Sequence, residues 1–152
     1  MTEPFIFDTA TPRFALPLLF AGQAQKEFFV NEAMLKSDLL LHCVIEGEVD
    51  APPINPVPGQ AWLVGSAPQG DFAGHDGEIA GRTEAGWRFV EPRDGLHVFD
   101  RASGSFRLYA GSWRRPAAPV MPTGGAVIDA EARGALASLL QKLIQAGVLA
   151  TS

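Results

Sequence analysis

The residues with the clearest chemical potential lie between positions 70 and 80, in the stretch GDFAGHDGEIA. His75 precedes Asp76, and two further acidic side chains stand within a few positions. Imidazole nitrogen and carboxylate oxygen atoms can bind a divalent metal ion or transfer protons as an acid and a base. The same stretch is rich in glycine, and Asp76-Gly77 is a dipeptide typical of hairpin turns. The alternative is therefore a structural loop fixed by His75, Asp76 and Gly77.

No other pattern in the sequence indicates catalysis. Nucleophile elbows, phosphate-binding loops, zinc pairs and dinucleotide fingerprints have no counterpart here. The three histidines, at positions 42, 75 and 97, share no short ligand spacing, and the single Cys43 forms neither an intrachain disulfide nor a zinc cage. We expect no enzyme, no cofactor and no metal. A cell-wall hydrolase would need activity that depends on His75 or Asp76.

Aromatic side chains near one turn suggest a different kind of site. The run FRLYAGSW contains Tyr109 and Trp113 close to polar neighbours. Sugar rings stack on exposed aromatic planes, so Tyr109 and Trp113 are the candidate residues for binding a glycan. In a strand, Tyr109 and Phe106 would point to opposite faces, and one of those faces is core.

Charge and hydropathy exclude two classes of partner. The net charge is −5, from 12 basic and 17 acidic residues, and the basic residues are scattered. Phosphate backbones need clustered basic side chains, so we expect no nucleic acid partner. The apolar run at 14–22 is too short to cross a bilayer, contains Pro17 and lacks the basic flank of a signal peptide. We expect a soluble protein that folds in a cytoplasm and has no membrane partner.

The first part of the chain predicts an arm and then a helix. Residues 1–22 combine prolines with many apolar side chains, which predicts an extended arm that lies against its own domain or a neighbouring subunit. From Gln23 the apolar residues recur at helical spacing and predict a helix that ends in the low forties. Asn31 has the side chain to cap a second helix start.

Residues 23–114 are expected to form one compact domain. After a proline-rich connector at 50–59, short alternating runs separated by glycine-rich turns predict strands. These runs are QAWLVGS, GEIAGRT, GWRFVEP, GLHVFDR, SFRLYAG and SWRR. The pattern indicates antiparallel hairpins. The predicted fold class is α+β, mainly β, with a small antiparallel sheet or a barrel-like domain.

The C-terminal part predicts a helix that joins copies of the chain. A Pro/Gly linker at 115–126 precedes residues 127–152, where Asp129 is the predicted N-cap and Gly147 the predicted C′ residue. Large aliphatic residues recur there at spacings of three and four: Leu136, Leu139, Leu140, Leu143 and Ile144. A stripe of this kind left in water favours aggregation. We expect identical helices to bury it against each other, and the alternative is that the helix folds back on its own sheet.

Several stretches together resemble a phage-associated family of unknown function, DUF2793. They are TPRFALPLLFAGQAQKEFFVNEAMLKSD, APPINPVPGQAWLVGSAPQGDFAGHDGEIAGRTEAGWRFVEPRDG and LYAGSWR, and they match the motifs of that family in order and spacing over about residues 10–114. The helical sequence that follows is similar to the closing helix of many members. Gln60-Ala61 stands where many members have Gly-Asp. Phe28-Phe29 replaces a more polar pair and marks a candidate subunit contact.

The resemblance implies a structural protein of a phage, prophage or gene transfer agent particle, with no catalytic residue. Such proteins are associated with tail fibres and head spikes. A length of 152 residues with no repetitive shaft then favours an oligomeric adaptor or base that joins capsid, tail or fibre proteins to a receptor-binding protein. It would be assembled in the bacterial cytoplasm and located on the virion. We favour a trimer, with a pentamer as the alternative. The other function left open is a carbohydrate-binding module for host surface polysaccharide.

Overall fold

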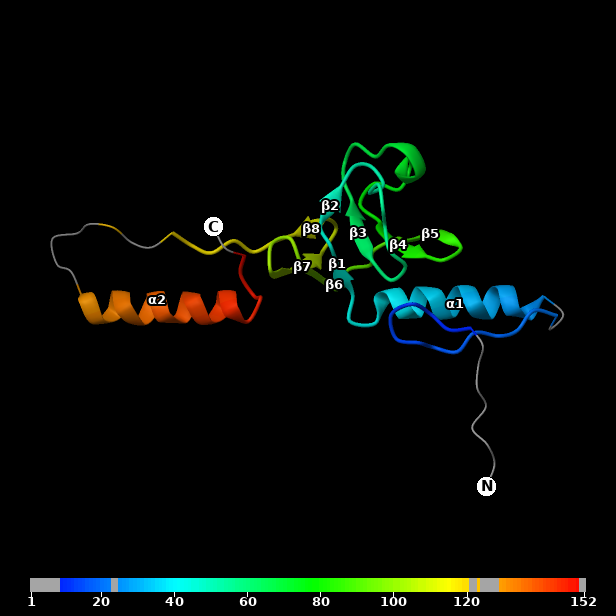
Figure 1. The fold of residues 1–152 in the computed structure, drawn as a ribbon. Helices are drawn as coiled ribbons and strands as arrows, with labels where there is room; N and C mark the ends of the chain where they lie inside the picture. Colours follow the sequence, from blue (N-terminus) through cyan, green and yellow to red (C-terminus); the bar gives the residue numbers. More distant parts are fainter. Residues whose placement is uncertain (1–8, 23–24, 121–122, 124–128, 151–152) are drawn as a thin grey trace, which may run out of the picture. The chain divides into compact units, whose positions relative to one another are not determined.

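The chain has an α+β fold that is mainly β, as the sequence predicts (Figure 1). The computed structural model describes residues 9–22, 25–120, 123 and 129–150. The elements are α1 (Lys26–Leu40), β1 (Val44–Ile45), β2 (Glu48–Val49), β3 (Ala61–Val64), the short 3-10 helix η1 (Gly70–Phe72), β4 (Ile79–Thr83), β5 (Gly86–Val90), β6 (His97–Asp100), β7 (Ser105–Tyr109), β8 (Trp113–Arg114) and α2 (Ala130–Gln145). All six predicted strand runs after the proline-rich connector form strands. The start of the predicted arm and part of the predicted linker lie outside the described residues.

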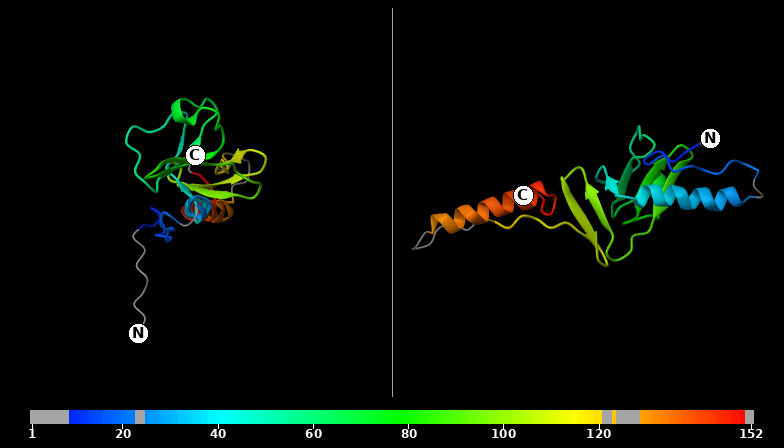
Figure 2. Two further views of the ribbon diagram at one scale, coloured as in Figure 1. Left: turned by 90° about the vertical axis from the view of Figure 1, so that its right-hand side faces the viewer. Right: turned by 90° about the horizontal axis from the view of Figure 1, so that it is seen from below.

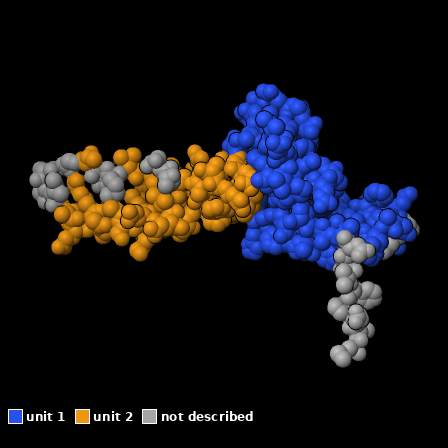
Figure 3. Space-filling view, in the orientation of Figure 1, with its two compact units in different colours: residues 1–43, 48–91 blue, residues 44–47, 92–152 orange. Residues whose placement is uncertain are grey.

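The chain divides into two compact units (Figure 3). Unit 1 contains residues 1–43 and 48–91, and unit 2 contains residues 44–47 and 92–152. Each unit has its own four-stranded sheet, in the order β2-β3-β4-β5 in unit 1 and β1-β6-β7-β8 in unit 2. Neither sheet closes into a barrel within the described residues, so the barrel-like alternative is wrong.

Both sheets contain one parallel pair, which the sequence analysis did not predict. In unit 1, β2 runs parallel to β3, and in unit 2, β1 runs parallel to β6. The proline-rich segment 50–60 explains the first pair, because it carries the chain back to the end of the sheet where β2 began. Both parallel pairs involve β1 or β2, which precede the runs for which antiparallel hairpins were predicted. The consecutive pairs β3–β4, β4–β5, β6–β7 and β7–β8 are antiparallel, as predicted.

Unit 1 has an aromatic core beneath its sheet. Val64, Phe72 and Ala80 are buried together, and Trp87 and Phe89 pack against them. Phe72 meets both of these rings edge to face, with centroids 4.9 Å from Trp87 and 5.8 Å from Phe89. Edge-to-face contacts between aromatic rings stabilise the folded state beyond the contribution of the buried apolar area alone.

Helix α1 packs on this sheet through Leu39, which is buried. Its side chain lies so close to Gly81 in β4 that a Cβ atom there would be 2.7 Å from Leu39 Cδ2. Glycine at position 81 therefore allows the helix and the strand to approach each other.

The described part of the N-terminal arm lies against α1 of the same chain. Asp38, near the end of the helix, is buried, and its Oδ1 accepts hydrogen bonds from Thr11 Oγ1 at 2.6 Å and from the Phe14 N–H at 2.8 Å. Its Oδ2 accepts from the Arg13 N–H at 3.0 Å. One carboxylate thus receives three hydrogen bonds from the arm, which offset the cost of its burial.

Arg13 also closes the C-terminal end of α1. Its guanidinium donates to the carbonyl oxygens of Asp38 at 2.8 Å, Leu39 at 2.7 Å and His42 at 2.9 Å. The last carbonyl groups of a helix have no partner within it and carry a partial negative charge. A cation from the arm therefore performs the capping role at this end.

The prediction of a second helix start at Asn31 is wrong. Helix α1 is continuous from Lys26 to Leu40, and Asn31 lies inside it. Its side chain accepts from the Leu19 N–H at 2.8 Å and donates to the Leu19 carbonyl at 3.0 Å. The amide group bonds the arm instead of capping a helix.

In unit 2, α2 ends against the sheet. Asp129 caps its start by accepting from the Ala132 N–H at 2.9 Å, and Gly147 is the C′ residue with φ +71°, as predicted. The Gly147 carbonyl accepts from the Phe106 N–H of β7 at 2.8 Å. The segment 115–120 runs beside α2 in Figures 1 and 2, and Ala117 forms a parallel bridge with Ala150.

Candidate functional site

The loop with His75 and Asp76 packs as part of the unit 1 core. The ring of His75 stacks on that of Phe89, with centroids 3.6 Å apart and planes at 3°. The ring Nδ1 lies 3.1 Å from Glu78 Oε2, and the backbone N–H of His75 donates to the Phe72 carbonyl at 3.0 Å. One face and one nitrogen of the imidazole are thus already engaged.

Backbone hydrogen bonds hold the same loop in one path. The Gly77 N–H donates to the Val64 carbonyl at 3.0 Å, and Gly77 has φ +75°, a conformation that favours glycine. Asp76 is exposed. Among the described residues no group of three or more His, Cys, Asp or Glu side chains is placed to hold a metal ion. The geometry of His75, Asp76 and Gly77 is that of a loop built around the buried Phe72.

Tyr109 and Trp113 are neighbours across β7 and β8. They are directly paired in the register, and their ring centroids are 5.3 Å apart with planes at 69°. Both side chains are half-buried. This arrangement leaves part of each ring accessible on unit 2, which a glycan ring would need.

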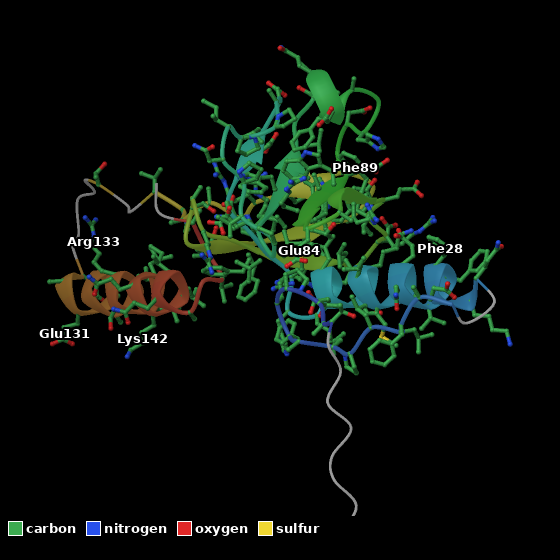
Figure 4. The ribbon with its side chains drawn as sticks, turned by 45° about the vertical axis from the view of Figure 1, so that its right-hand side comes forward. Phe28, Glu84, Phe89, Glu131, Arg133 and Lys142 are labelled. Atoms are coloured by element: carbon green, nitrogen blue, oxygen red, sulfur yellow. The ribbon has the colours of Figure 1, made fainter. Side chains whose placement is uncertain are left out.

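The aliphatic stripe of α2 is only partly covered. No residue of α2 is buried: Leu140, Leu143 and Ile144 are half-buried, whereas Leu136 and Leu139 are 48% and 53% exposed. In Figure 4, Glu131 and Lys142 leave the helix on one side and Arg133 on the other. The exposed leucines lie between these polar positions around the helix, so an apolar face remains available.

Phe28 and Phe29 form a second exposed apolar feature, on α1. They are 71% and 82% exposed, although burial of a phenylalanine side chain usually stabilises a protein. The sequence analysis marked this pair as a candidate subunit contact. Its exposure is compatible with that role and leaves the partner open.

The side chains that organise unit 1 most strongly were missed from the sequence. Thr11, Arg13 and Asp38 form the network between arm and helix, yet they are separated by about 25 residues and match no local motif. An available signal was Asp38 itself. It is a charged residue directly before the apolar run Leu39-Leu40-Leu41, at the end of a helix where an acid is electrostatically unfavourable without a cationic partner.

No helix among the described residues is both long and apolar enough to cross a membrane.

Comparisons with known proteins identify the family of the chain. A comparison with curated proteins gave no match. The family DUF2793, described as a protein of unknown function, matches residues 30–114, which is more than half of the chain. This range includes most of α1 and all eight strands. The arm, with its sequence Thr11-Pro12-Arg13, and α2 lie outside it. The chain therefore belongs to the DUF2793 family.

Proposed function

We propose that this protein is an oligomeric structural component of a phage-like particle, an adaptor or base of a head spike or tail fibre that attaches a receptor-binding protein. The observation that supports this proposal best is α2. The helix is capped at both ends, yet it buries no residue and exposes Leu136 and Leu139. A stable helix with an open aliphatic face suits association with copies of itself.

Two further features support the proposal. The resemblance of the motifs in the chain to phage-associated proteins implies a place on a particle. The imidazole of His75 stacks on Phe89, which suits a structural role of this loop. A particle component needs one surface that joins copies and another that contacts different proteins.

The test is the position of the protein on purified particles. Particles from the producing bacterium would be labelled with gold-conjugated antibodies against this chain and viewed by electron microscopy. We expect label at spikes or fibres, and less label when the chain carries both Leu136→Asp and Leu139→Asp. Absence of the chain from purified particles would overturn the proposal.

A carbohydrate-binding module is the second candidate, and the Tyr109–Trp113 pair supports it. The two rings meet edge to face and both are partly exposed, which leaves aromatic surface for a sugar ring. The test is a glycan array followed by titration of tryptophan fluorescence. A true site gives a response that Trp113→Ala removes and Trp62→Phe retains. Absence of any response on the array excludes this candidate.

A further inference from the structure

Unit 1 contains a groove between the arm and α1. Two adjoining hollows, each of about 400 Å³, share Thr9, Asn31 and Leu35 as lining residues. One extends to Glu84 at the turn between β4 and β5, and the other extends to Phe28 on α1; both residues are labelled in Figure 4. We name the two hollows together the arm groove. Volumes of this size are typical of sites that bind ligands or peptide side chains.

The walls of the arm groove are apolar at the side of α1. Leu19, Phe20, Phe28 and Leu35 contribute to the lining. Phe20 is 45% exposed and Phe28 is 71% exposed, so their rings form an accessible rim. Aromatic side chains, phenylalanine included, are enriched at protein interfaces.

The charged side chains that line the arm groove are mostly acidic. They are Glu27, Glu32 and Glu84, with Arg88 as the one base. Glu32 already has cationic partners, since Arg88 Nε donates to its Oε2 at 2.8 Å and Lys36 Nζ lies 3.4 Å from its Oε1. Glu27 and Glu84 form no ion pair with any other described residue. The groove therefore carries negative charge that the described part of the chain does not neutralise.

Glu27 has an oxygen atom that lacks a partner. Its Oε1 accepts from the Gly22 N–H at 3.1 Å, whereas its Oε2 is buried and accepts no hydrogen bond from the described residues. A carboxylate oxygen removed from water without a donor costs free energy. The carboxylate of Glu27 also lines the hollow that contains Phe28, so its negative charge attracts a cationic side chain placed there.

We propose that the arm groove binds an extended segment of a partner protein in which one lysine or arginine stands between aliphatic residues. The basic side chain pairs with Glu27, and the aliphatic side chains pack against Phe20, Phe28 and Leu35. The charge of the groove selects the cation, and its apolar rim selects the neighbours of that cation. This inference is independent of the proposed place on a particle, because it depends only on the geometry of unit 1.

The test is a titration of the full-length, ¹⁵N-labelled protein followed by NMR. The probe is the peptide acetyl-Ala-Leu-Lys-Leu-Ala-amide, and its control has glutamine in place of lysine. We expect shifts at the backbone amides of Thr9, Leu19 and Asn31. We also expect the lysine peptide to bind at least about fivefold more tightly than the glutamine peptide, as one charge-assisted hydrogen bond predicts.

Variants separate the roles of charge and apolar contact. Glu27→Gln keeps the acceptor for the Gly22 N–H and should remove the preference for lysine, whereas the matched change Glu131→Gln in α2 should retain it. Phe28→Ala should weaken both peptides by a similar factor, and its exposed position makes misfolding no concern.

Three results would overturn the inference. The first is equal affinity of the unchanged protein for the two peptides, and the second is a lysine preference that survives Glu27→Gln. The third is a change in the same amide signals with protein concentration and without peptide, which would identify a second copy of the chain as the occupant.

Discussion

Asp38 joins the arm to the helix through a single buried side chain. It accepts from Thr11 Oγ1 and from two backbone N–H groups, so all three donors depend on one carboxylate. Hydrogen bonds to a charged group contribute more than neutral ones, and a buried donor left without a partner is costly. The arm should therefore depend on this side chain more than on its own apolar residues.

Replacing Asp38 by asparagine should destabilise unit 1 by about 2 to 3 kcal/mol. The new NH₂ group would face the Arg13 N–H, which is itself a donor, so at least one hydrogen bond is lost. Urea unfolding followed by tryptophan fluorescence measures the effect. The matched change Asp76→Asn, at an exposed carboxylate, should stay within about 0.5 kcal/mol of the unchanged protein. Equal effects of the two changes would contradict this role of Asp38.

Because the thiol of Cys43 is buried, we expect the free energy of unfolding to depend on pH in the alkaline range. Burial raises the pKa of its thiol from 9.0 to about 11, although the nearby charge of Arg13 acts in the opposite direction. Because the folded state holds the proton more tightly than the unfolded chain, its contribution is constant below about pH 9 and is lost as the pH rises towards about 11. The loss is at most about 1.4 kcal/mol per pH unit.

Urea unfolding at a series of pH values between about 8 and 11 measures this dependence. Cys43→Ala is the control, because the variant is less stable overall but has no thiol to ionise. Other groups titrate in the same range in both proteins, so the difference between the two curves reports Cys43. Parallel curves would show that the thiol contributes nothing.

For single residues, the sequence predicted local backbone geometry more accurately than contacts between distant segments. The C′ glycine at 147 and the capping aspartate at 129 were correct, because each depends on residues only a few positions away. Asn31 was wrong because its partner, Leu19, belongs to the arm. A propensity scale cannot distinguish an amide that caps its own helix from one that binds another segment.

At the scale of elements, Gly147 is the joint between α2 and the sheet of unit 2. Its φ of +71° suits glycine, and a Cβ atom there would lie 3.3 Å from the ring of Phe99 and 3.4 Å from that of Phe106. Its carbonyl accepts a hydrogen bond from β7. Position 147 therefore requires both a left-handed backbone and the absence of a side chain.

Gly147→Ala should destabilise unit 2 by about 1 kcal/mol or more and detach α2 from β7. Gly134→Ala is the matched control, since Gly134 lies inside α2 with nothing within 4 Å of its Cβ position. That second change should stabilise the helix by up to about 1 kcal/mol. Thermal unfolding by circular dichroism measures both, and hydrogen exchange at the Phe106 amide should accelerate only in Gly147→Ala. If Gly147→Ala and Gly134→Ala shifted the thermal stability in the same direction, the proposed role of Gly147 would be refuted.

The strands after the proline-rich connector and their antiparallel pairs were predicted, whereas the two parallel pairs were not. Runs such as GEIAGRT and GWRFVEP show alternating residues beside a tight turn at Glu84-Ala85, and they became β4 and β5. The pairing of Val44 with Phe99 is parallel and joins residues distant in sequence, where no turn fixes the register. Local turn chemistry therefore predicted neighbours along the chain and nothing beyond them.

For the whole molecule, the exposed leucines of α2 predict an oligomer. Changing Leu136 and Leu139 together to aspartate should give a monomer in analytical ultracentrifugation, because charges cannot be buried in an apolar interface without a partner. The control Ile54→Asp, at a residue that is 95% exposed in unit 1, should leave the mass unchanged. A monomeric unchanged protein, or a double variant that keeps the oligomer, would contradict the prediction. The mass also distinguishes three copies from five.

The parallel pairing of β1 with β6 has a consequence during protein synthesis. Val44–Ile45 leaves the ribosome about 55 residues before the strand that it pairs with, whereas the sheet of unit 1 is complete in sequence at Val90. Contacts between such distant residues form slowly, and an unpaired strand edge is prone to aggregation. A nascent chain from which β5 but not β6 has left the ribosome would therefore hold one finished sheet and one unprotected strand, and this is the stage at which a chaperone would protect it from aggregation.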